Sequence, residues 1–327
     1  MIAYIIRRVA YAVPILLGVN LLLFLLFFWV NSPDDLAKTA LGEKFSNKEQ
    51  IEIWKQEHGY NLPLFFNARE GSLKLMLTQT IFWQKSMPLF WFNFGKSDMD
   101  DSSITGEIWK RIPPSLCITA PTFFFSLAFT IFAAMIVAFY RGTYVDLWAL
   151  LLCVLMMSIS QLFYIIGGQF VIAKWMMLTP VSGWDTGIYS IKFLILPIIV
   201  GLISAIGGGI RYNRTIFLEE IGKDYVRTAR AKGLGEGTVL YKHALKNAML
   251  PILTSVVVSI PFLIMGSLLI ENFFGIPGLG SYTIDAITKQ DFSVIRAMVF
   301  LGSVLYVSGL IMVDISYTLV DPRIRFE

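Results

Sequence analysis

Six apolar runs, separated by polar stretches, constrain the fold of this chain more than any other feature. A helix needs about 20 apolar residues to cross the roughly 30 Å hydrocarbon layer of a membrane. The chain is 56% hydrophobic and only 15% charged, which is too apolar for a single aqueous core. The sequence therefore predicts an all-α integral membrane protein with six transmembrane helices, at about residues 9–30, 114–139, 147–173, 193–210, 249–270 and 294–319.

Basic residues in the short segments between these runs predict the orientation of the chain. Cytoplasmic loops carry an excess of Lys and Arg, whereas long extramembrane segments are exempt from this rule. If the N-terminus is cytoplasmic, the short outside segments hold only Lys174, Lys192, Lys289 and Arg296. The inside segments hold many more, and we therefore expect both termini in the cytoplasm: Arg7, Arg8, Arg141, Arg211, Arg214, Lys223, Arg227, Arg230, Lys232, Lys242, Lys246, Arg323 and Arg325.

The polar stretches divide the chain into three regions. Residues 1–30 form the N-terminal cytoplasmic end and the first transmembrane helix, and residues 31–111 form an insertion on the outer side. Residues 112–327 form a five-helix core that carries a cytoplasmic loop at 211–248. This loop is long, basic and punctuated by glycines, so we expect it to have a shape that a partner can bind.

The insertion carries signals for a short helix and for contact with lipid. Ser46 and Glu49 have the spacing of a capping box, and Gly59 is placed to end a helix, which predicts a helix at about 47–58. Aromatic residues are typical of segments at the level of the lipid headgroups, although they could also form a surface that stacks on a substrate. Six of them crowd one part of the insertion: Phe82, Trp83, Phe90, Trp91, Phe92 and Phe94.

The sequence contains no pattern that predicts catalysis or a bound cofactor. Gly95-Lys96-Ser97 resembles the end of a phosphate-binding loop, but Phe90 occupies the position of the first required glycine. Two histidines and two cysteines are too few and too scattered for a His/Cys metal cluster. No nucleophile elbow, no zinc-protease helix and no basic stripe with aromatics for nucleic acid is present. We therefore expect neither an enzyme nor a nucleic-acid-binding protein.

Two further features lie within the predicted spans. Gly201, Ala205 and Gly209 recur every four residues, a spacing that lets two helix backbones approach closely, within this chain or against a second subunit. A loose glycine-rich hinge is the alternative. Asp314 is the clear ionisable residue inside a span, where such residues mark ion-coupling sites unless they reach the interface or pair with a basic residue.

The cytoplasmic loop at 211–248 has the pattern of two helices joined by a sharp turn. Apolar residues recur every four positions over about 216–231, at Phe217, Ile221, Tyr225 and Ala229, which predicts a helix with one apolar face. Gly233, Gly235 and Gly237 then break the helix, and Gly233 stands where a left-handed cap belongs. A second short helix follows and leads through Pro251 into the fifth span: it begins at Val239, Leu240, Ala244 and Leu245.

This loop resembles the EAA loop of the permease subunits of ATP-binding-cassette importers, in particular the oligopeptide/dipeptide branch. The general family pattern is E-A-A-x-x-x-G followed by I-x-L-P, and only Ala229, Gly233 and Leu245 keep it here. The peptide branch itself typically shows R-T-A-R-A-K-G-L and H-A-L-K-N-A, which this chain has. The resemblance implies an ATPase-coupling loop comprising Arg227, Thr228, Ala229, Arg230, Ala231, Lys232, Gly233, Leu234, His243 and Leu245.

Other segments extend the resemblance over nearly the whole chain. They are the R-R pair before the first span, Y-N-L-P at 60–63, N-F-G at 93–95, G-S through G at 266–280, and V-D-P-R-I at 320–324. The ending D-I-S-Y-T-L at 314–319 is similar to that of the Yej-type peptide permeases. The order of these segments along one chain is more specific than any one of them.

The resemblance implies the fold, the partners and the location of the protein. The fold would be the type I importer permease fold, in a bacterial inner membrane, with a periplasmic insertion after the first helix. The partners would be a second homologous permease, two cytoplasmic ATPase subunits that bind ATP and Mg²⁺, and an external substrate-binding protein. Peptides would be the cargo, with nickel chelates, glutathione and sugar oligomers as alternatives. A proton-coupled transporter or channel remains the rival class, and a membrane-embedded enzyme is a more remote one.

The segment after the fifth span is a candidate for the outer end of a transport path. Gly275, Pro277, Gly278 and Gly280 disfavour a continued helix or an ordinary loop. Non-helical backbone at membrane depth occurs where protein or a water-filled cavity surrounds it. We expect residues 271–280 to fold back and line an outer gate, with Glu271 contacting the ammonium end of a peptide. A simple turn into the amphipathic stretch 281–290 is the alternative.

Overall fold

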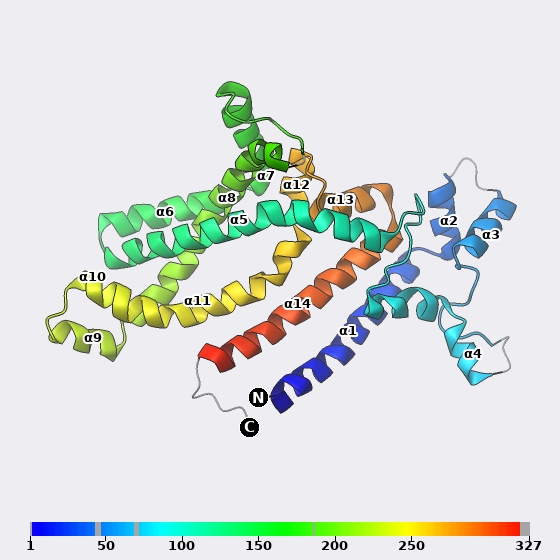
Figure 1. Ribbon diagram of the computed structural model, residues 1–327, viewed down its shortest axis with the longest axis horizontal. Coiled ribbons are helices and arrows are strands. Elements are labelled where there is room, and N and C mark those ends of the chain that lie inside the picture. Colours follow the sequence, from blue (N-terminus) through cyan, green and yellow to red (C-terminus); the bar gives the residue numbers. More distant parts are fainter. Residues whose placement is uncertain (1, 43–46, 69–71, 186, 321–327) are drawn as a thin grey trace. The chain divides into compact units, whose positions relative to one another are not determined.

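The computed structural model describes residues 2–42, 47–68, 72–185 and 187–320. Helices dominate these residues, and the only β-pairing among them is an isolated bridge between Lys96 and Ser103. Figure 1 shows the helices in chain order. The all-helical fold predicted from the apolar runs is confirmed.

Five helical segments of the described residues are long and apolar enough to cross a membrane. They are Ile5–Phe28, Ile104–Phe139, Ile191–Ile221, Glu236–Phe274 and Phe292–Ser316. The first lies within α1 (Ile2–Val30), the second is α5, the third is α8 and the last lies within α14 (Phe292–Val320). The fourth combines several consecutive elements: α10 (Glu236–Thr238), η5 (Val239–Ala244), α11 (Leu245–Ser259), η6 (Pro261–Met265) and α12 (Leu268–Phe274).

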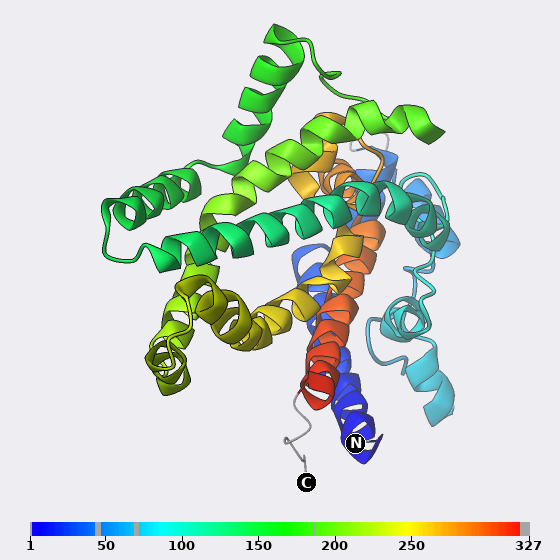
Figure 2. The same ribbon diagram turned by 60° about the vertical axis from the view of Figure 1, so that its left-hand side comes forward.

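The third predicted span, 147–173, is not one straight helix. It consists of α6 (Tyr144–Ser158), α7 (Gln161–Gly168) and the π-helical η3 (Gln169–Trp175), with a bend of 89° between α6 and α7. Figure 2 shows α7 leaving α6 at this bend. Ile159 and Ser160 are extended, and Ser158 Oγ donates a hydrogen bond to the carbonyl of Val154, a local bond that competes with helix continuation. The pair makes a sixth span if it is counted as one.

The chain forms two compact units. One contains the residues up to Arg111 together with Tyr282–Ile311, and the other contains Ile112–Ser281 and the end of α14 from Met312. The short elements of the first unit are α2 (Pro33–Leu41), α3 (Lys48–Glu57), α4 (Leu73–Thr78), η1 (Phe82–Ser86) and η2 (Met87–Trp91). The second unit also contains η4 (Gly187–Ser190) and α9 (Asp224–Ala231), and α13 (Leu279–Lys289) begins in it.

The insertion packs a hydrophobic core against the C-terminal half of α1. Phe24 of α1 is fully buried among Leu36, Ile51, Trp54 and Ile81. α2 and α3 lie side by side in this core (Figure 1). The helix expected at 47–58 is confirmed as α3, and Gly59 beyond its end has φ +68°. The capping box differs, however: it joins Asn47 to Gln50, and Ser46 lies outside the described residues.

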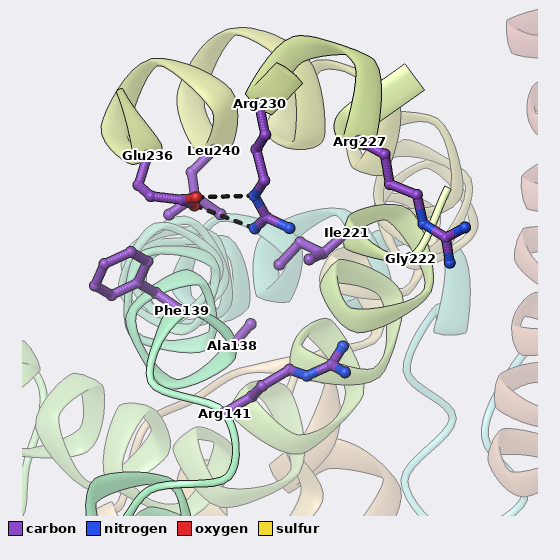
Figure 3. A pocket seen from close by; sticks show the side chains of 9 residues that line it. All are labelled: Ala138, Phe139, Arg141, Ile221, Gly222, Arg227, Arg230, Glu236 and Leu240. Carbon is purple, nitrogen blue, oxygen red and sulfur yellow. Dashed lines mark hydrogen bonds and ion pairs between the residues drawn. The ribbon is translucent and has the colours of Figure 1, made fainter. Parts of the chain in front are cut away.

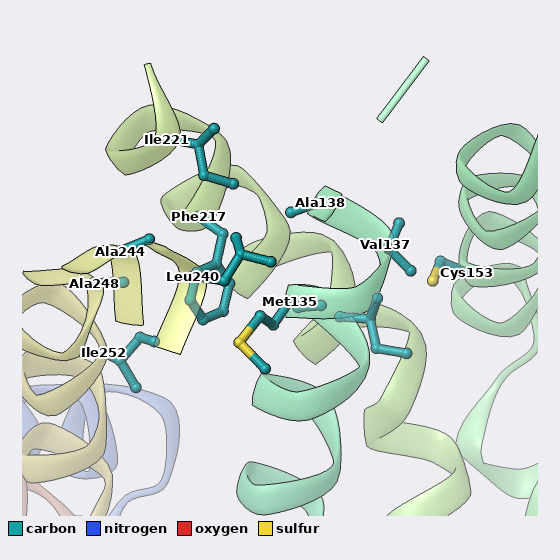
Figure 4. Close-up of a cluster of buried hydrophobic side chains, with 12 residues drawn as sticks. Met135, Val137, Ala138, Cys153, Phe217, Ile221, Leu240, Ala244, Ala248 and Ile252 are labelled. Carbon is teal, nitrogen blue, oxygen red and sulfur yellow. The ribbon is translucent and has the colours of Figure 1, made fainter. Parts of the chain in front are cut away.

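The second unit is held together by a core around Phe217 of α8. Phe217 packs with Met135 of α5, Leu240 of η5 and Ile252 of α11, as Figure 4 shows. Arg214 of α8 makes a two-pronged ion pair with Asp146 near the start of α6, with both nitrogen to oxygen distances 2.8 Å. The ends of the helices that carry the loop at 211–248 are therefore held by both apolar packing and a charge pair.

Candidate functional site

We call the loop predicted at 211–248 the handle. Its first residues are helical, because the preceding helix does not stop at residue 210. α8 continues to Ile221, and a separate helix, α9, runs from Asp224 to Ala231. The single helix expected over 216–231 is therefore wrong. Lys223 is extended, with ψ 154°, and interrupts it. The second helix of the handle runs from α10 through η5 into α11 without a comparable break.

A buried carboxylate holds the break between α8 and α9. Glu220 is 6% exposed and accepts hydrogen bonds from Nζ of Lys223 and from the hydroxyl of Tyr225, the latter at 2.6 Å. The hydrogen bond to Glu220 is the main reason that the pKa of Lys223 is raised. Glu220 therefore turns the chain by joining the last turn of α8 to the first turn of α9, a role that no spacing in the sequence indicated.

The turn between α9 and α10 depends on Gly233 and a charge pair. Gly233 has φ +77°, the left-handed conformation that favours glycine. Across the turn, Arg230 donates two hydrogen bonds to Glu236, at 2.8 and 3.1 Å, which Figure 3 shows as dashed lines. The backbone conformation of Gly233 and the side-chain pair of Arg230 and Glu236 therefore both hold the turn.

The handle has a small core of its own. Val226, Ala229 and Val239 are buried together, with Tyr225 packed against them. Ala229 is only 5% exposed, so it supports the handle from inside rather than forming part of its outer surface. His243 and Leu245, in the second helix of the handle, are partly buried. The other predicted coupling residues are exposed: Arg227, Thr228, Arg230, Ala231, Lys232, Gly233 and Leu234.

A cationic cavity of about 480 Å³ lies beneath the handle. Its apolar lining comes from the ends of α5 and α8 and from Leu240, and three arginines surround it (Figure 3). Arg230 is paired with Glu236, and Arg227 is 3.5 Å from Asp224. Arg141 has no side-chain hydrogen bond or ion pair within the described part of the chain, so the cavity has an excess of positive charge.

Residues 271–280, which follow the predicted fifth span at 249–270, fold back toward the start of α12. Gly266, with φ +72°, breaks the chain before α12, and Gly275, with φ +65°, ends this helix in a left-handed cap. The chain then turns into α13 at Leu279. The side-chain amide of Gln169 donates hydrogen bonds to the carbonyls of Phe273 and Val181, so η3 and the 181–183 segment support α12.

Glu271 is enclosed by this folded segment and does not line an open mouth. Its side chain is 0% exposed, and its carboxylate accepts hydrogen bonds from the backbone N–H groups of Ser267, at 3.2 Å, and Ser281, at 3.1 Å. In this conformation it has no exposed surface with which to contact the ammonium end of a peptide, and the expected contact with cargo stays a prediction. Glu271 instead joins the start of α12 to the start of α13.

Glycines surround the Glu271 carboxylate because a larger residue would collide with it. A Cβ at Gly266 would lie 1.9 Å from Oε1 of Glu271, and a Cβ at Gly278 would lie 2.3 Å from Oε2. A Cβ at Gly280 would lie 2.7 Å from the backbone carbonyl of Ser267. Pro277, between them, is exposed. The glycine pattern that indicated an irregular segment thus leaves room for a buried carboxylate and a close backbone approach.

The small residues of α8 face two different helices. A Cβ at Gly201 would lie 2.8 Å from Thr122, and one at Gly209 would lie 2.6 Å from Thr130, so both glycines admit α5. Ala205 is exposed and does not take part. A Cβ at neighbouring Gly207 would lie 2.8 Å from the carbonyl oxygen of Cys153, so this glycine admits α6. The run of three glycines at 207–209 carried this signal, but only the structure shows which glycine faces α6.

Within the described residues, no three His, Cys, Asp or Glu side chains are grouped to hold a metal ion. The described residues instead form helices of membrane-spanning length, a handle with its own small core and a folded-back segment. This combination of parts is that of a membrane protein with a shaped extramembrane loop and no cluster of metal ligands among the described residues.

Comparison with known families identifies this membrane protein. Residues 126–326 match the family described as binding-protein-dependent transport system inner membrane component, and residues 1–119 match its N-terminal companion. The chain belongs to this family. It is therefore a transport permease of the inner membrane and not an enzyme, and the family works with ATPase and substrate-binding components.

Relatives of full length support the assignment. The chain is 31% identical over 332 residues to the Putative peptide transport system permease protein of Brucella abortus (strain 2308), with 100% of both chains covered. It is 28% identical over 336 residues to the glutathione transport system permease protein GsiC of Escherichia coli (strain K12), again with 100% of both covered. GsiC of Shigella flexneri serotype 5b is similarly related, at 28% over 330 residues.

Proposed function

We propose that this chain imports peptides through a bacterial inner membrane as one of two different permease subunits. The second permease, two cytoplasmic ATPase subunits and a periplasmic binding protein would complete the assembly. ATP and Mg²⁺ would be held by the ATPase subunits rather than by this chain. Both termini and the handle would lie in the cytoplasm, as the distribution of basic residues predicts.

The single observation that carries the proposal is that the handle has a hydrophobic core of its own beneath an exposed, basic turn. A connecting loop would need no core, yet this one buries Val226, Ala229 and Val239 and presents a cationic turn to solvent. An exposed surface that is supported by its own core is suited to docking on a partner. The ATPase subunit is the cytoplasmic partner that the family supplies.

The handle is joined to the spans in a way that would transmit movement. α8 runs unbroken from Ile191 to Ile221, and the second helix of the handle continues into α11. Closure of the ATPase pair would therefore move two helices at their cytoplasmic ends. ATP and the loaded binding protein would each favour one of two conformations of the permease through contacts that differ between them.

Peptides are the preferred cargo, because a peptide permease and two glutathione permeases are among the full-length relatives. Glutathione is itself a small peptide, so the relatives named as peptide permease and as glutathione permease carry cargo of the same chemical class. Nickel chelates and other small solutes remain the alternatives carried by similar machinery.

Transport in proteoliposomes tests this function. The purified assembly, with ATP sealed inside and binding protein outside, should accumulate a radiolabelled tripeptide, and omission of ATP or of the binding protein should abolish uptake. Accumulation driven by a proton gradient without ATPase subunits would overturn the proposal in favour of an ion-coupled transporter.

A further inference from the structure

A second cavity, of about 320 Å³, lies in the first compact unit. It is formed by the end of α3, the η1–η2 region, the segment around residues 93–96 and the start of α14. Cations and amides dominate its polar lining, with Arg296 and Lys85 as its most buried cations. The volume falls within the range of pockets that hold small ligands.

Arg296 is buried here without a partner. It is 5% exposed, and its Nε has neither solvent contact nor a hydrogen-bond partner. No hydrogen bond or ion pair to its guanidinium occurs within the described residues. A buried charge that is left unpaired is strongly destabilising, so a structure retains it only where something else compensates. Arg296 is among the residues that line the cavity, so a compensating anion would have a way in beside it.

Two buried carboxylates of the same unit, Asp98 and Asp291, are engaged elsewhere. Both oxygens of Asp98 accept the hydroxyl of Tyr60, at 3.1 Å, and Asp291 accepts hydrogen bonds from Ser97 and from the backbone of Val294. Neither forms an ion pair with Arg296 or Lys85 within the part of the chain that the structure describes. Glu57 also lines the cavity, at its exposed rim.

Lys85 adds a second cation that lacks a carboxylate partner. Its ammonium lies 4.7 Å from the centre of the Tyr60 ring, a cation–π contact and not an ion pair. Burial lowers the pKa of Lys85, an effect that the field of Asp98 opposes and that of Arg296 reinforces. Lys96 stands exposed at the rim. The cavity is thus electropositive at depth as well as at its mouth.

We propose that this cavity is a binding site for a carboxylate, and that the carboxyl terminus of a short peptide is its natural source. The Arg296 guanidinium would hold the carboxylate in the two-pronged geometry that arginine prefers. The side-chain amides of Gln56, Gln84 and Asn93 line the same cavity and suit the amide groups of a peptide. The choice of a peptide rests on the proposed function, whereas the choice of a carboxylate rests on this structure alone.

The test measures binding to the full chain, purified with its partner subunits in lipid nanodiscs and without the binding protein. Glycylglycine should bind, and acetate should compete with it. Glycylglycine amide should bind on the order of tenfold or more weakly, because a charge-assisted hydrogen bond is lost. Arg296→Gln should weaken glycylglycine binding by a similar factor, Arg296→Lys should weaken it less, and Lys48→Gln, at an exposed site on α3, should have no effect.

Thermal unfolding without ligand distinguishes this site from a purely structural arginine. Arg296→Gln should unfold at the wild-type temperature or higher, because it removes an unpaired buried charge, and glycylglycine should raise the midpoint of the wild type only. Equal binding of the amide, unchanged binding by Arg296→Gln, or preference for inorganic phosphate over both carboxylates would overturn the proposal. If the cargo were not a peptide, acetate would still bind in an Arg296-dependent way, so the two proposals can fail separately.

Discussion

Single glycines determine the geometry at two turns, for different physical reasons. Gly233 has nothing within 4 Å of the position that a Cβ would take, so its constraint lies in its φ of +77°. Gly278 has no positive φ, and its constraint is the carboxylate of Glu271, which a Cβ would meet at 2.3 Å. A substitution at the first site therefore tests backbone strain, and one at the second tests packing.

Gly233→Val should uncouple the permease from ATP hydrolysis. A β-branched residue in the left-handed region costs on the order of 1 kcal/mol or more, and relief of that strain would re-aim the second helix of the handle. Gly235→Val is the matched control, because Gly235 has φ −62° and open space around it. We expect loaded binding protein to stimulate ATPase activity in the control but not in Gly233→Val. Equal stimulation in both variants would contradict the role of Gly233 in coupling.

Gly278→Ala should destabilise the folded-back segment by about 1–3 kcal/mol, the usual cost of forcing extra atoms into a packed site. Glu271→Ala should also destabilise it, because the N–H groups of Ser267 and Ser281 lose their acceptor. The double variant should be less destabilised than the sum of the two, since the collision disappears with the carboxylate. Thermal unfolding of the three variants measures this coupling, and strict additivity would show that Gly278 and Glu271 do not interact.

At the scale of whole elements, hydropathy predicted where the helices lie but not where they end or bend. Apolar runs are reliable because a span must satisfy its own backbone in lipid. α8 extends past residue 210 because its polar continuation still favours a helix, which hydropathy cannot register. The 89° bend after Ser158 and the break at Lys223 depend on local hydrogen bonds of Ser158 and Glu220. The burial of Ala229 and Glu271 depends on partners distant in the sequence or on the fold of a whole turn.

The contact between α6 and α8 can be tested with two neighbouring glycines. A Cβ at Gly207 would lie 2.8 Å from the carbonyl oxygen of Cys153, whereas Gly208 has nothing within 4 Å. Gly207→Ala should destabilise the protein by about 1–3 kcal/mol because backbone cannot yield easily. Gly208→Ala should be neutral or stabilise the helix by about 0.5–1 kcal/mol. Unfolding temperatures in detergent measure both, and equal effects would mean that α6 does not approach α8 at Gly207.

Two alanines separate the core of the handle from its surface. Ala229→Glu places a charge beside Val226 and Val239 in the small core, so the handle should unfold locally. Ala231→Glu makes the same change at an exposed site and should leave the handle folded. Limited trypsin digestion should therefore cut Ala229→Glu within the handle much faster than Ala231→Glu or the wild type. ATPase stimulation should be lost in Ala229→Glu, and equal resistance to trypsin would show that the small core does not hold the handle.

For the molecule as a whole, the distribution of basic residues predicts which side of the membrane each segment faces. The family establishes a multi-pass membrane protein, and the excess of basic residues predicts that the handle is cytoplasmic. The insertion and the 176–190 segment should then face the periplasm. The proposals about transport and about coupling to the ATPase subunits depend on this arrangement, because the ATPase subunits and the binding protein are separated by the membrane.

Cysteine labelling in intact cells tests the orientation. In a variant lacking Cys117 and Cys153, single cysteines would replace Glu49 in the insertion, Ser182 after η3 and Lys232 in the handle, all of which are exposed. An impermeant thiol reagent should label positions 49 and 182 from outside, because only those segments reach the periplasm. Position 232 should stay unlabelled until the cells are opened, and its labelling afterwards is the control for reactivity. Labelling of position 232 in intact cells would reverse the orientation and remove the handle from any cytoplasmic ATPase.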